Sequence, residues 1–156
     1  MINNLENVGE GVEFYRGIPT EEHVGDFNND FVILDDLMED CKNNLVTKLF
    51  SQVAHHSHVT FFLLLQNFFH IGRSQSLNAH YLFFMMNARD KLTIRNLAMQ
   101  MYPSNVKFLV QAFEDATRNR PYSHLFIDLT PETEDQLRVR GNIFESEVTV
   151  YAPRQL

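Results

Sequence analysis

Three runs of apolar residues constrain the fold of this chain more than any other feature. They are Phe31–Leu34, Val59–Leu65 and Tyr81–Met86, and Tyr122–Leu129 is a fourth strand candidate. A strand with one wet face alternates apolar and polar residues, whereas a strand buried on both faces reads as a continuous apolar run. We therefore expect a parallel sheet flanked by helices on both faces, which is an α/β fold.

Helical periodicity fills the sequence between these strands. A first helix is expected from about residue 41 to residue 56, a second after Asp90 as its N-cap, and a third after Pro103-Ser104. Their apolar residues recur at spacings of three and four: Leu45, Val46, Leu49, Phe50 and Val53; Ile94, Leu97, Ala98 and Met101; Leu109, Ala112, Phe113 and Ala116. Helices of this length can serve as the crossover connections that parallel strands need.

Size and composition indicate one intracellular domain. The chain has 156 residues, of which 44% are apolar, and its single cysteine, Cys41, cannot form an internal disulfide. No apolar run reaches the roughly 18–20 residues that cross a bilayer, so we expect no membrane partner. The net charge of -7 argues against a surface that grips nucleic acid by bulk charge. We expect a polar irregular segment over 1–30, a core over 31–145 and a tail or edge strand over 146–156.

Polar residues follow three of the expected strands. Asp35-Asp36 ends the first, Gln66-Asn67 the second and Asn87 the third. In open parallel sheets, ligands bind beyond the carboxyl ends of the strands. Two adjacent carboxylates at the end of a buried strand are costly unless a cation or hydrogen-bond donors compensate them. The pattern therefore favours a site at this edge over a simple exit of the chain into solvent.

The chemistry expected at this edge is that of a magnesium-dependent phosphate site. Asp35 would hold Mg²⁺, which bridges the phosphates, and Asp36 would polarise the attacking water. Gln66 or Asn67 would hydrogen-bond that water or the terminal phosphate. Arg73 and Arg89 are candidates for an arginine that stabilises transition-state charge at a neighbouring subunit.

These residues resemble the viral DNA-packaging ATPases of the FtsK–HerA superfamily, of the Maverick/Polinton and adintovirus type and distantly poxvirus-like. The similar segments cover about residues 10–145 and occur in the expected order: Phe31–Met38, Leu63–His70, Ser76–Tyr81, Asn87–Asp90, Ala98–Pro103 and Leu125–Pro131. The resemblance implies a P-loop fold in which Asp35 and Asp36 are the Walker B pair and Gln66-Asn67 the polar sensor. It also implies an oligomeric motor that uses Mg²⁺ and ATP to drive double-stranded DNA into a capsid.

The sequence departs from this family at the phosphate loop. That loop requires Gly-x-x-x-x-Gly-Lys-Ser/Thr, and this chain contains no Gly-Lys pair. The resemblance therefore covers a carboxyl-terminal portion that lacks the phosphate-loop strand, so we expect no tight ATP binding by this chain. Strands left with unpaired edges favour self-association.

Two other interpretations remain open from the sequence. The chain can be a non-catalytic remnant of a mobile element that binds other proteins through exposed strand edges. It can also be an unrelated α/β binding domain in which Asp35-Asp36 has no catalytic meaning.

Overall fold

The computed structural model describes residues 11–27, 30–35, 44–49, 58–68, 73–118 and 120–154. The chain divides into two compact units, and each is described by itself. The first unit comprises Met1–Gln66 with His70–Ser74, and the second comprises Asn67–Phe69 with Gln75–Leu156. None of the described helices is long and apolar enough to span a membrane.

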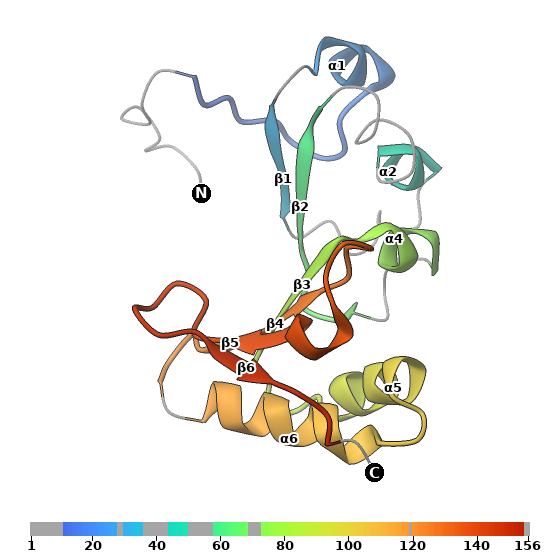
Figure 1. Cartoon of the computed structure of the whole chain (residues 1–156). Coiled ribbons are helices and arrows are strands. Elements are labelled where there is room, and N and C mark those ends of the chain that lie inside the picture. The colour runs from blue at the N-terminus through green and yellow to red at the C-terminus, as the bar shows by residue number, and fades with distance from the viewer. Residues whose placement is uncertain are drawn as a thin grey trace. The chain divides into compact units, whose positions relative to one another are not determined.

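The first unit contains a parallel pair of strands (Figure 1). Its elements are α1 (Glu21–Asp26), β1 (Phe31–Asp35), α2 (Asn44–Lys48) and β2 (Thr60–Leu64). In the register of the pair, Phe31 lies opposite Thr60 and Asp35 lies opposite Leu64. The expected strands at both positions, and their parallel pairing, are therefore confirmed. Most of the helix expected over 41–56 lies outside the described residues.

Among the residues described, the core side chains pack against one face of this pair. Leu34 packs with Val46 and Leu49 into a small core, and Val32 and Leu63 lie against it. The residues between them point the other way and stay exposed, Phe31 at 75% and Ile33 at 63%. The expectation of burial on both faces is therefore wrong for β1 and β2. A continuous apolar run is compatible with burial of both faces of a strand. It does not show whether helices pack on one face or on both.

The second unit is an antiparallel sheet with helices on one face (Figure 1). Strands β3 (Tyr81–Met85), β4 (His124–Asp128), β5 (Val139–Gly141) and β6 (Thr149–Tyr151) pair in that order. Its helices are α5 (Leu92–Met101) and α6 (Val106–Thr117), with a 3₁₀ turn at Asp135–Leu137. Helix α4 (Arg73–Asn78) begins where the two units divide.

The parallel arrangement expected for the third and fourth strands is wrong. Met85, the last residue of β3, lies opposite His124, the first residue of β4, so the two strands are antiparallel. Two helices connect them, as the sequence predicted, and the error lies in the strand direction inferred from them. A single helix carries the chain back along the sheet and gives a parallel strand, whereas a second helix returns it to the end where β3 finished.

The core of the second unit lies between the sheet and its two helices. Leu109 of α6, Leu125 and Ile127 of β4, and Val139 of β5 are fully buried there. The N-cap of α5 is Lys91, one residue later than expected, but Asp90 still accepts a hydrogen bond from the backbone N–H of Thr93 to its Oδ1 at 3.1 Å. Hydrogen bonds from the Thr93 side chain and backbone lower the pKa of Asp90.

The last strand is fixed to α6 by a tyrosine. The Tyr151 hydroxyl donates to Asp115 Oδ2 at 2.9 Å, and burial together with this hydrogen bond raises the pKa of Tyr151 to about 12. Gly141 of β5 lies beneath this contact. A Cβ atom on Gly141 would come within 3.3 Å of both Ala116 Cβ and Tyr151 Cε2, so the close packing of β5 on α6 favours glycine.

Candidate functional site

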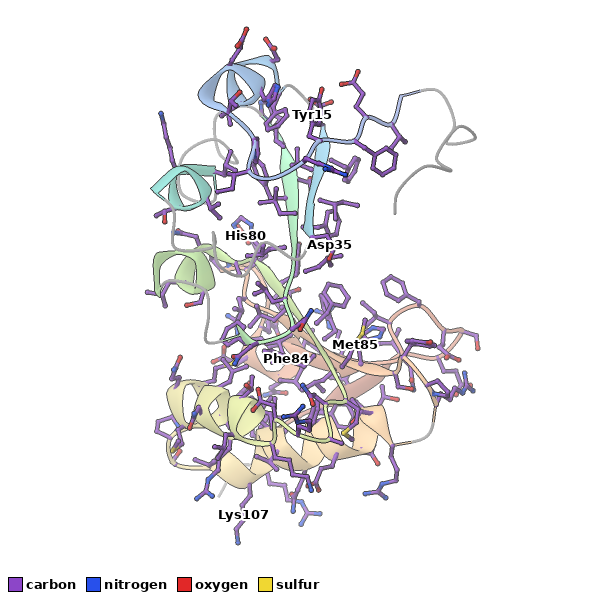
Figure 2. The ribbon with its side chains drawn as sticks, turned by 180° about the vertical axis from the view of Figure 1, so that it is seen from behind. Tyr15, Asp35, His80, Phe84, Met85 and Lys107 are labelled. Atoms are coloured by element: carbon purple, nitrogen blue, oxygen red, sulfur yellow. The ribbon has the colours of Figure 1, made fainter. Side chains whose placement is uncertain are left out.

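The carboxyl end of β1 presents Asp35 to solvent (Figure 2). Leu34 points into the core of the first unit, and the period of the strand then places Asp35 on the opposite, exposed face. Because Asp35 pairs with Leu64, the neighbouring strand ends at the same edge and Gln66 follows two residues later. The structure thus brings Asp35 and the residues after β2 to one edge of a parallel pair.

The other expected site residues are not all brought to this edge. Asp36 follows directly in sequence but lies outside the described residues, and Asn67 belongs to the second unit. Arg73 begins α4, and its side chain also lies outside the described part of the chain. Arg89 is exposed in the turn after β3, where its backbone N–H donates to Asn87 Oδ1 at 3.0 Å.

Asn87 was expected to share the sheet edge with Asp35, and this expectation is wrong. Asn87 follows β3, which pairs with β4 in a separate antiparallel sheet. The rule that ligands bind beyond the carboxyl ends of parallel strands applies only to strands of one sheet. The continuous apolar runs indicated strands correctly but did not reveal that they belong to two sheets.

One exposed carboxylate suits a magnesium ion that is shared with a phosphate. Mg²⁺ is usually bound by one or two carboxylates together with waters and substrate phosphates. Within the described ranges, no group of three or more His, Cys, Asp and Glu side chains converges to hold a metal. Asp35 therefore fits one ligand position of such an ion. A triphosphate does not fit this chain alone, because the sequence lacks the glycine-rich loop that surrounds it.

Sequence reasoning missed a buried carboxylate network at the end of β4. Asp128 is 7% exposed and accepts hydrogen bonds from the Thr130 backbone N–H at 3.0 Å and hydroxyl at 2.6 Å, and from the Thr133 hydroxyl at 2.8 Å. Arg140 Nη2 lies 3.5 Å from Asp128 Oδ2. Arg138 Nη1 donates to the backbone oxygens of Asp128 and Thr130 at 3.1 and 2.8 Å.

This network is structural in character. Burial opposes ionisation of Asp128, but the hydrogen bonds from Thr130 and Thr133 and the charge of Arg140 outweigh it and lower its pKa. The network closes the loop between β4 and β5. An Asp followed two residues later by Thr and then Pro is a turn signal, and it could have revealed the loop from sequence.

Comparisons of the chain with protein-family models, with curated proteins and with solved structures find no match.

Proposed function

We propose that this chain is part of an ATP-driven DNA-packaging motor of the FtsK–HerA superfamily, from a virus-like mobile element, and that it is inactive as an isolated chain. The parallel pairing of β1 with β2 carries the proposal. It supports a site at the strand edge where P-loop ATPases bind magnesium and phosphate, with Asp35 at the end of one strand and Gln66 after the next.

In the intact enzyme each residue has a distinct role. Asp35 holds Mg²⁺ and Asp36 polarises the attacking water. Gln66 and Asn67 supply the neutral groups that sense the terminal phosphate. Arg73, with Arg89 as the weaker candidate, stabilises the transition state across a subunit interface. The proposed partners are further copies of the enzyme, double-stranded DNA and capsid proteins, in the nucleus or cytoplasm.

Calorimetric titration of the isolated chain with Mg-ATP is expected to show no tight binding. Carboxylates that coordinate a metal cannot hold a triphosphate without the backbone N–H groups and lysine of a phosphate loop. A version of the chain extended upstream to include an in-frame Gly-Lys-Ser or Gly-Lys-Thr loop is the matched positive control, and it should bind. Micromolar affinity of the isolated chain for Mg-ATP would contradict the proposal that it carries the metal-binding residues without a functional phosphate site.

A second function, that of a protein-interaction module, is favoured by the uncovered face of β1 and β2. Phe31, Ile33, Phe62 and Leu64 are 43–75% exposed on this face, and the rings of Phe31 and Phe62 stack with centroids 6.3 Å apart. Contiguous exposed apolar side chains mark interaction sites in soluble proteins. Both strands also have an unpaired outer edge within the described part of the chain.

Size-exclusion chromatography tests this second function. The isolated chain is expected to elute as an oligomer at high concentration, and the double variant Ile33→Thr/Phe62→Thr is expected to elute as a monomer. Threonine keeps the preference for a strand while removing apolar surface. Val150→Thr, at an exposed position of β6, is the matched control and should not change the elution. A wild-type chain that stays monomeric at every concentration would rule out self-association through this face.

A further inference from the structure

A pocket of about 640 Å³ lies in the second unit, where β3 ends and the chain enters β4. Met85 and Met86 line it from the end of β3, and Arg118, Arg120 and Tyr122 line it from the segment after α6. Its volume falls within the range of small-molecule sites, which combine apolar walls with a few polar groups. Neither the proposed ATPase site nor the Asp128 network uses these residues.

The pocket carries two arginines and favours an anionic ligand. Arg118 is exposed and forms no salt bridge with the described residues, and Arg120 forms one with Glu145 at 2.5 Å while its side chain stays 66% exposed. Glu145 pairs with Arg120 alone among the described arginines, so its charge leaves that of Arg118 uncompensated there. A phosphate, with more oxygens than a carboxylate, can accept from both guanidinium groups.

Tyr122 stands at a backbone position that favours glycine. The Ser123 N–H donates to the Arg120 oxygen at 3.2 Å, which closes a turn with Pro121 and Tyr122 at its centre. Tyr122 has φ +66°, a left-handed conformation that is unfavourable for a bulky side chain, and its side chain is 86% exposed. The turn thus presents an exposed aromatic residue at a pocket that the two arginines also line. Exposed rings of this kind are surfaces on which nucleic-acid bases stack.

We propose that this pocket binds a nucleotide, with Arg118 and Arg120 on its phosphate and Tyr122 against its base. The nucleotide is either free or part of a single strand, since both present a phosphate beside a flat ring. The C-terminal end of α6, at Arg118, carries a partial negative charge that opposes an anion, so binding requires both arginines. This inference does not rest on the proposed ATPase ancestry, because every residue lies in the second unit and none belongs to the Asp35 edge.

Fluorescence anisotropy with a labelled ten-nucleotide thymidine strand tests the site, with unlabelled thymidine monophosphate as competitor. The strand should bind at low salt, and the affinity should fall as salt rises. Displacement by the monophosphate would identify a free nucleotide as a sufficient ligand, whereas binding of the strand alone would identify single-stranded nucleic acid. Either result supports the site. Absence of binding by both probes at low salt overturns it.

Variants separate the proposed contacts from folding effects. Arg118→Gln/Arg120→Gln should weaken binding about tenfold or more, because charged hydrogen bonds are lost, while Arg95→Gln on α5 should leave it unchanged. Glu145→Gln should strengthen binding, since it removes the carboxylate that competes for Arg120. Tyr122→Gly should raise the melting temperature yet weaken binding about fivefold or more. An unchanged affinity in the double arginine variant would refute the proposal.

Discussion

Replacing Asp128 with alanine is expected to lower the free energy of unfolding by about 3 kcal/mol, because a buried charged network loses its centre. The Thr130 and Thr133 hydroxyls would lose their acceptor and Arg140 its buried partner. Urea denaturation followed by circular dichroism measures the change. The matched control is Asp135→Ala, which removes an exposed carboxylate 2.7 Å from Arg138 and should cost no more than about 0.5 kcal/mol.

The same carboxylate gives the protein a defined response to acid. The pKa of Asp128 is below its ordinary value of 3.8, so its stabilising effect is complete above that pH and is lost as the pH falls through the lower folded-state value. Asp128→Asn should keep the shape of the side chain and lose this part of the acid response. Equal stability of the alanine variant and the native chain would show that the network contributes nothing.

The second large effect concerns the proposed ATPase, and it is expected in a longer version of the chain that includes a phosphate loop. There Asp36→Asn should reduce ATP turnover by at least about 100-fold while nucleotide binding is preserved, because the amide cannot polarise the attacking water. Steady-state ATPase assays and a parallel binding titration measure the two quantities. Asp30→Asn, just before β1, is the matched control. Unchanged turnover in Asp36→Asn would contradict the role proposed for this residue.

The sequence was informative wherever short-range patterns determine structure. The positions of β1, β2 and β3 follow from apolar runs, and the start of α5 follows from Asp90 to within one residue, because strand burial and helix capping act within a few residues. The direction of β4 did not follow. It depends on the end of the sheet to which α5 and α6 together bring the chain. The sequence alone does not show whether two successive helices lead to the far end, giving a parallel strand, or back to the end of β3, giving an antiparallel one.

The sequence predicted the positions of some candidate site residues, and their roles stay predictions. Asp35 and Gln66 follow the two apolar runs that predicted β1 and β2, but the runs did not determine strand direction, because a run of the same kind forms the antiparallel β3. The partners of Asp128 could not be inferred in full, because Arg140 lies 12 residues away and meets the carboxylate only through the pairing of β4 with β5. The left-handed conformation of Tyr122 was also hidden, since the turn there has a tyrosine in place of the usual glycine.

The uncovered face of β1 and β2 has a consequence for every stability measurement on this chain. Association of two copies through Phe31 and Phe62 would withdraw apolar surface from water, and the extent of association would depend on protein concentration. The apparent melting temperature would then rise with concentration even though no intramolecular contact had changed. Denaturation at a dilution series, extrapolated to low concentration, isolates the intrinsic stability against which the Asp128 variants should be compared.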